Sequence, residues 1–96
     1  MGKKLPPDEL KLYKAIDEIL WNDWDPIGVN DVHEARDEYQ GYLPHLFRLA
    51  IEGKDANHIS SSLISTVETN IGLGANNEHC YRVAVKIVNA KKELLG

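Results

Sequence analysis

The sequence predicts an all-α protein: a small four-helix bundle whose second helix is kinked and whose first helix is followed by a Trp-Asp-Pro loop. Apolar residues recur at three- and four-residue steps in four separate stretches, which is the period of one buried helix face. No stretch of useful length alternates apolar and polar residues as a strand would. Breaks rich in Pro, Gly, Asn and Asp separate the four stretches and predict where the helices end.

The length and composition favour one globular domain. The chain has 96 residues, of which 43% are hydrophobic and 27% charged, and these shares are ordinary for a folded protein. Residues 1–7 end in two prolines and are expected to form a loose basic leader. Residues 8–96 are expected to form a single helical domain.

The first helix is predicted at residues 8–22. Asp8 and Glu9 lie where the N-terminus of a helix favours negative charge. The buried face is formed by apolar side chains spaced three or four residues apart, namely Leu12, Tyr13, Ile16, Ile19 and Leu20.

The longest break between helical patterns runs from Trp21 to Asp31 and contains both tryptophans of the chain. Pro26 disfavours the α conformation at Asp25, so the helix is expected to stop there. We expect a rigid corner in which the two indoles close one end of the core. The residues predicted to build this corner are Trp21, Trp24, Pro26, Gly28 and Asn30.

The second helix is predicted to begin near Val32, with Asn30 or Asp31 as its cap and Glu34 completing a capping box. Gly41 and Pro44 interrupt the pattern. An interior proline removes one helical hydrogen bond, so a kink or short break is expected around residues 40–43.

The third helix is predicted to be capped by Asp55, with Ile59, Leu63, Val67 and Ile71 as its apolar stripe. It is rich in Ser and Thr, which are poor helix formers, so it must draw its stability from packing. Asn76 is predicted to cap the fourth helix.

The region between residues 22 and 40 is strongly acidic. It carries six acidic residues and one basic residue, Arg36, which gives a local charge of −5 against −4 for the whole chain. The acids are Asp23, Asp25, Asp31, Glu34, Asp37 and Glu38. They form either a solvated helix face or a surface that meets a basic protein, since complementary charge speeds encounter and fixes register.

Aromatic residues gather beside these acids. We expect Trp21 and Trp24 in the core, whereas for Tyr39 and Tyr42 both the core and a docking surface stay open. The candidate partner-binding surface therefore consists of Asp25, Asp31, Glu34, Asp37, Glu38, Tyr39 and Tyr42.

No catalytic residue, metal site or cofactor is predicted. The four histidines are scattered, and Cys80 is the single cysteine, placed on the apolar face of the fourth helix as a buried thiol. The net negative charge disfavours nucleic acid and anionic membranes as partners. The start lacks the apolar stretch of a signal peptide and no run could span a bilayer, so a cytoplasmic protein is expected.

One part of the chain resembles a known family. The motif Trp24-Asp25-Pro26-Ile27-Gly28-Val29-Asn30, followed by Arg36-Asp37-Glu38-Tyr39, Tyr42-Leu43-Pro44 and Arg48-Leu49, resembles small uncharacterised bacterial proteins and is similar to the YugE-like domain. The resemblance implies a small helical bacterial domain with a Trp-Asp-Pro turn after its first helix. It supplies no catalytic residues.

Three functional hypotheses follow. The first is a non-enzymatic interaction protein that binds a basic partner through its acidic face; its size and acidity are those of immunity proteins that neutralise secreted bacterial toxins. The second is a small enzyme or ligand-binding domain that uses a cleft at the Trp24–Asn30 loop, because long loops in compact domains are often functional. The third is a self-associating structural module. The sequence leaves the oligomeric state unknown.

Overall fold

The structure is a computed structural model of the chain, and it describes residues 5–25, 28, 32–72 and 74–96. Within these ranges the chain forms four α-helices and no strand, so the predicted small all-α bundle is confirmed. None of the helices described has the length and apolar character that crossing a membrane would require.

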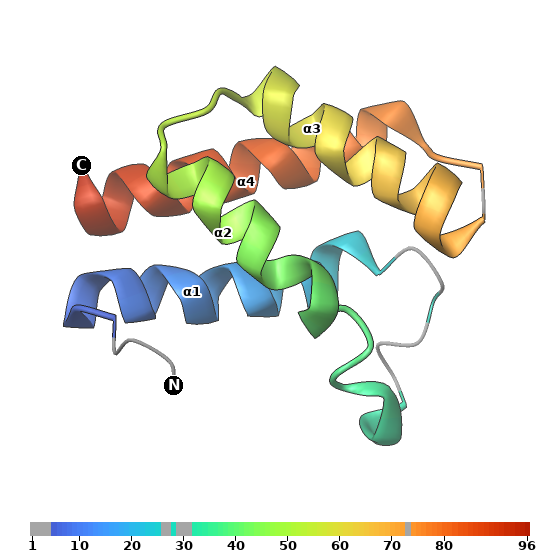
Figure 1. Cartoon of the computed structure of the whole chain (residues 1–96), viewed down its shortest axis with the longest axis horizontal. Helices are drawn as coiled ribbons and strands as arrows, with labels where there is room; N and C mark the ends of the chain where they lie inside the picture. The colour runs from blue at the N-terminus through green and yellow to red at the C-terminus, as the bar shows by residue number, and fades with distance from the viewer. Residues whose placement is uncertain (1–4, 26–27, 29–31, 73) are drawn as a thin grey trace.

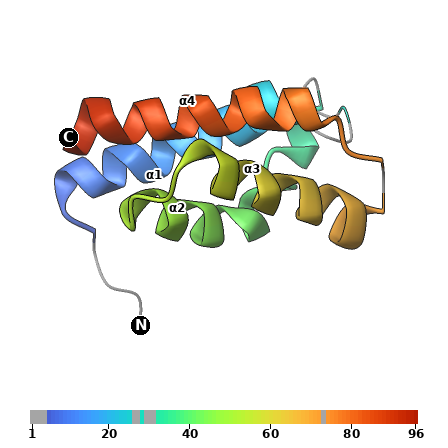
Figure 2. The ribbon, with the colours of Figure 1, turned by 90° about the horizontal axis from the view of Figure 1, so that it is seen from above.

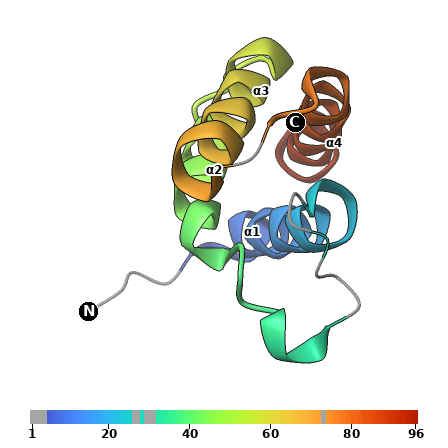
Figure 3. The ribbon, with the colours of Figure 1, turned by 90° about the vertical axis from the view of Figure 1, so that its right-hand side faces the viewer.

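The helices form two layers (Figures 1 and 2). Helix α1 (Pro7–Ile19) and the long helix α4 (Asn77–Leu95) run antiparallel in one layer, and α2 (Leu43–Ile51) and α3 (Ala56–Ser65) form the other. Helix α4 packs along both α1 and α3, and α2 closes the side of α1. Viewed from one end, the four helices surround a common centre, and the segment before α2 lies to one side of α1 (Figure 3).

The core lies at this centre. Leu12 and Ile16 of α1, Ile59 and Leu63 of α3, and Ile87 of α4 are completely buried. Their spacing is the helical period that the sequence shows. Burying each of these side chains contributes about 1.5–3 kcal/mol.

Helices α1 and α3 end in the same way. Each continues into a wider π-helical turn, η1 (Leu20–Trp24) after α1 and η4 (Thr66–Ile71) after α3. Each turn is followed by a residue in the left-handed region, Asp25 with φ 33° and Gly72 with φ 82°. The backbone N–H of that residue donates to the carbonyl five residues back, at 3.0 Å for Asp25 and 2.9 Å for Gly72. These bonds satisfy carbonyls that a helix end would otherwise leave free.

The predicted second helix is only partly correct. The break expected at residues 40–43 is present, but the residues before it form two short 3-10 turns, η2 (His33–Ala35) and η3 (Gln40–Tyr42), in place of an α-helical arm. Helix α2 begins at Leu43, with Pro44 in its first turn, where a missing N–H costs nothing. Pro44 therefore starts a helix and does not kink one. The proposed cap at Asn30 or Asp31 lies outside the described residues.

Both remaining caps are confirmed. The Asp55 carboxylate accepts the backbone N–H of His58 at 2.9 Å, and the Asn76 side chain accepts that of His79 at 3.0 Å. Helix α1 begins one residue earlier than expected, at Pro7, and of the basic leader only Leu5 and Pro6 precede it in the described part of the chain.

We expect Asp55→Ala and Asn76→Ala each to lower the free energy of unfolding by about 1 kcal/mol, because each leaves a helix N-terminal N–H without its acceptor. Urea denaturation followed by circular dichroism measures the loss. Asn57→Ala is the control for α3, since Asn57 is exposed in the same turn but is not the cap. A loss for Asn57→Ala as large as that for Asp55→Ala would contradict the capping role.

Candidate functional site

The acidic region predicted from the sequence is a defined structural unit, residues 33–42, which we call the acidic segment. Several backbone N–H groups of the segment donate to the carbonyl three residues back, among them Arg36 to His33, Glu38 to Ala35 and Tyr42 to Tyr39. Side chains three residues apart lie on the same side in such a conformation. Arg36, Tyr39 and Tyr42 accordingly turn toward the bundle, while Glu34, Asp37 and Glu38 are exposed.

Tyr39 fixes the middle of the acidic segment to the bundle. Its side chain is 2% exposed and its ring lies 6.1 Å from the Trp21 ring and 5.5 Å from the Trp24 ring, measured between centroids. The Tyr39 hydroxyl donates a 2.6 Å hydrogen bond to the Asp25 carboxylate. Hydrogen bonds to a charged acceptor are among the stronger ones in proteins.

Arg36 fixes the start of the segment to α1. Its guanidinium donates to both carboxylate oxygens of Asp17, at 3.0 and 3.2 Å, and to Glu18 at 3.2 Å. It also lies 5.3 Å from the centre of the Trp21 ring. The hydrogen bond with Asp17 raises the pKa of Arg36, so its positive charge is retained and is directed toward α1.

The exposed carboxylates of the segment pair with no cation in the part of the chain that the structure describes. Among the described residues, no ion pair or hydrogen bond engages the side chains of Glu34, Asp37 and Glu38. Two further acids of the region are engaged otherwise, because Asp23 pairs with Lys86 of α4 at 3.1 Å and Asp25 accepts the Tyr39 hydroxyl.

Two residues of the predicted partner-binding surface, Tyr39 and Asp25, have a structural role in the fold. Tyr39 is wrong as an exposed contact residue, because its ring is buried between the two indoles. Asp25 is half-buried and accepts the Tyr39 hydroxyl, so it acts first as a structural residue. Asp31 lies outside the described residues. Glu34, Asp37 and Glu38 are exposed together on one segment, with Tyr42 half-buried beside them.

The predicted corner is also formed where the structure describes it. Trp21 and Trp24 are buried, as expected. Gly28 adopts φ +68°, a conformation that favours glycine, and an added Cβ would meet no atom within 4 Å, so backbone conformation and not space selects glycine there. Pro26 and Asn30 lie outside the described residues.

Helix α4 is joined to this corner through its first turn. His79 Nε2 lies 3.1 Å from the Trp24 carbonyl oxygen, and because a carbonyl can only accept, Nε2 carries the proton. Cys80 is buried beside Trp24, and burial raises the pKa of its thiol. The Trp24 indole N–H is buried and makes no hydrogen bond of ordinary geometry among the described residues, but it lies close enough to the Cys80 thiol to oppose, in part, the rise of its pKa.

The structure has a hollow at the position that the ligand-binding hypothesis requires. This hollow, of about 190 Å³, lies at the corner and is lined in part by Trp24, Asp25, His79 and Cys80, so the ligand-binding alternative has a cavity where it requires one. It is smaller than the roughly 300–1,000 Å³ of most small-molecule sites. Within the described chain, no group of three or more His, Cys, Asp or Glu side chains is arranged to hold a metal ion.

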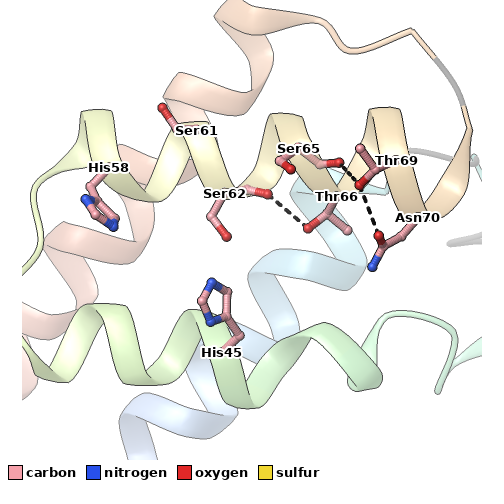
Figure 4. A pocket seen from close by; sticks show the side chains of 8 residues that line it. All are labelled: His45, His58, Ser61, Ser62, Ser65, Thr66, Thr69 and Asn70. Atoms are coloured by element: carbon pink, nitrogen blue, oxygen red, sulfur yellow. Dashed lines mark hydrogen bonds between the residues drawn. The ribbon is translucent and has the colours of Figure 1, made fainter.

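A second hollow was missed by the sequence reasoning. It is a polar groove of about 440 Å³ between α2 and the α3–η4 helix, into which the His45 ring rises from α2 toward Ser62 (Figure 4). The Thr66 hydroxyl donates to the Ser62 carbonyl at 2.9 Å, a bond back to the helix's own backbone. The run of Ser and Thr on the third helix was the available signal, but it was interpreted only as low helix propensity.

Comparison of the chain with protein-family models, with curated proteins and with solved structures finds no match. The fold and the site define a class: a small all-α domain that presents exposed carboxylates on an anchored surface segment.

We expect Tyr39→Phe to lower the free energy of unfolding by about 1.5–3 kcal/mol, because it removes a hydrogen bond to a carboxylate and leaves the ring packing intact. Thermal or urea unfolding measures this change. Tyr42→Phe is the matched control, since no hydrogen bond of the Tyr42 hydroxyl is found among the described residues, and its effect should stay within about 0.5 kcal/mol. Equal losses for the two variants would contradict the anchoring role of Tyr39.

Proposed function

We propose that the protein is a bacterial, non-enzymatic interaction domain, related to the YugE-like family, that binds a basic protein partner through Glu34, Asp37 and Glu38. In its specific form, the proposal is an immunity protein that neutralises a basic toxin of the nuclease type. The observation that carries the proposal is the exposure of these three carboxylates with no cation of the described chain paired to them.

The pairing of Arg36 supports this proposal. An arginine within the acidic segment would ordinarily offset its neighbours. Here its guanidinium is bound by Asp17 and Glu18, two acids outside the segment. The negative potential of the segment is therefore not offset locally, and a surface of this kind steers a positively charged protein toward it.

The anchoring of the segment supports it as well. A flexible acidic loop would lose conformational freedom when it bound, which costs affinity. In this chain Tyr39 and Arg36 already fix the backbone that carries the carboxylates. The segment thus offers charge at defined positions, which is what shape-specific binding requires.

A second candidate, from another class, is a ligand-binding domain that uses the hollow at the Trp24 corner. It is favoured by the buried Trp24 indole N–H, whose side chain lines this hollow and which faces only the weak acceptor Cys80 Sγ among the described groups that interact with it. A small acceptor ligand there would shift the indole resonance in an NMR spectrum and leave the carboxylates of the acidic segment unaffected.

Reversing two charges in the acidic segment tests the leading proposal. We expect the double variant Asp37→Lys/Glu38→Lys to bind the basic partner roughly 100-fold more weakly, because it replaces two attractive charge pairs by repulsive ones. The measurement is affinity capture from the native host followed by mass spectrometry, then titration calorimetry with the captured protein. Binding should also weaken as salt is raised.

The matched control is Glu52→Lys/Glu93→Lys. It makes the same change of net charge at two exposed acids outside the acidic segment, one just after α2 and one on α4. The control should retain the partner. Capture of the same proteins by both double variants and by the unchanged protein, with equal affinity, would overturn the proposal.

A further inference from the structure

A hollow lies at the inner edge of the acidic segment, where the segment meets the end of the third helix. Its volume is about 270 Å³, and it is lined by Glu38, Tyr39, Tyr42, Asn70 and Ile71. These residues come from two parts of the chain, the segment itself and the turn η4. No basic side chain is among the described residues that line it.

The hollow favours a positive charge for two separate reasons. The first is the carboxylate of Glu38, which no cation of the described chain engages. The second is the end of the helix that runs through α3 and η4 and stops at Ile71. The Val67 carbonyl at this end accepts the Gly72 N–H, and the carbonyls that follow it form the negative end of the helix dipole.

Tyr42 provides the aromatic wall of the hollow and Ile71 the aliphatic one, since the Tyr39 ring is only 2% exposed. Tyr42 is half-buried, and its ring is held edge-to-face against Trp24 at 6.0 Å between centroids. The Tyr42 hydroxyl makes no hydrogen bond with any described residue, so its oxygen is available as an acceptor. The Asn70 side-chain oxygen already accepts the Thr69 hydroxyl at 3.0 Å and has a second lone pair.

We propose that this hollow receives the guanidinium of one arginine side chain supplied by the partner protein. The inference deepens the proposed function, on which it rests, by naming the group that the acidic segment recognises. We define the pocket formed by these five residues as the arginine socket.

Arginine fits the socket better than lysine for physical reasons. A guanidinium is planar and weakly hydrated, packs flat against tyrosine rings, and directs several N–H donors in its plane toward a carboxylate and neutral oxygens. An ammonium is a compact, strongly hydrated charge, so the aromatic wall would favour it less. The volume suits one side chain and is below that of most sites for whole small molecules.

The arginine socket and a uniformly acidic surface make different predictions about which carboxylate is needed for binding. Glu38 lines the socket, whereas Glu34 is equally exposed on the same segment but does not. Glu38→Gln and Glu34→Gln each remove one negative charge and keep the shape of the side chain. A diffuse electrostatic surface predicts the same effect for both variants.

The test is an NMR titration of the isotope-labelled, unchanged protein with N-acetyl-arginine amide, and separately with N-acetyl-lysine amide at equal ionic strength. We expect the arginine compound to shift the amide signals of Asn70 and Ile71 with a dissociation constant on the order of 1 mM, as for a ligand of about fifteen heavy atoms. Glu38→Gln should weaken this binding at least about fivefold, and Glu34→Gln should change it by less than about twofold. Tyr42→Leu, which keeps apolar bulk and removes the ring and hydroxyl, should weaken it by a similar factor to Glu38→Gln.

Equal effects of the two Glu-to-Gln variants, equal affinity for the lysine compound, or no shift at Asn70 and Ile71 would each overturn the socket. These outcomes are distinguishable from failure of the proposed function. If Asp37→Lys/Glu38→Lys loses the captured partner and the arginine titration is negative, the acidic interaction surface is supported and the socket is rejected. Retention of the partner by that double variant would reject the interaction surface itself.

Discussion

The buried Tyr39 side chain is the contact on which the described surface depends. Residues 33–42 have no regular helix of their own, and single 3-10 turns gain little stability without tertiary contacts. Tyr39 supplies those contacts twice, because its ring packs against both indoles and its hydroxyl bonds to Asp25. Together with Arg36, which binds Asp17 and Glu18, it sets the positions of the exposed carboxylates.

Asp25 connects this anchor to the backbone of the corner. It is the one non-glycine residue of the described chain with a positive φ, and a left-handed conformation costs an ordinary residue about 1–2 kcal/mol. Asp and Asn bear that cost best, because their short polar side chains bond locally. At this position the aspartate both ends the π turn η1 and accepts the Tyr39 hydroxyl. The end of the first helix and the placement of the acidic segment are therefore one structural feature.

The acids near the acidic segment differ in whether they form ion pairs. Arg36 pairs with Asp17 and Glu18, and Lys86 pairs with Asp23; these three acids lie outside the acidic segment. Asp17, Glu18 and Asp23 are thereby compensated, whereas Glu34, Asp37 and Glu38 pair with no cation of the described chain. Within the described residues the segment therefore carries three negative charges that are not compensated, although the net charge of the whole chain is only −4. The proposed interaction surface and the arginine socket both derive from this local imbalance.

The sequence by itself determined the helices that carry a long apolar period, their caps at Asp55 and Asn76, and the burial of Trp21 and Trp24. These features depend on local chemistry, namely the spacing of apolar residues and the side-chain oxygen that a helix start requires. It also located the acidic region and the break near Gly41.

The tertiary structure decided the rest. The sequence pattern placed Tyr39 and Glu38 together as possible surface residues, and only the packing separates them, since the Tyr39 ring is buried against the bundle and Glu38 is left exposed. The α-helical arm expected before Pro44 is absent for the same reason: anchoring Arg36, Tyr39 and Tyr42 at three-residue steps selects a tighter turn than an α-helix has. The socket joins residue 38 to residues 70 and 71, and no local pattern encodes a contact between segments so far apart in the chain.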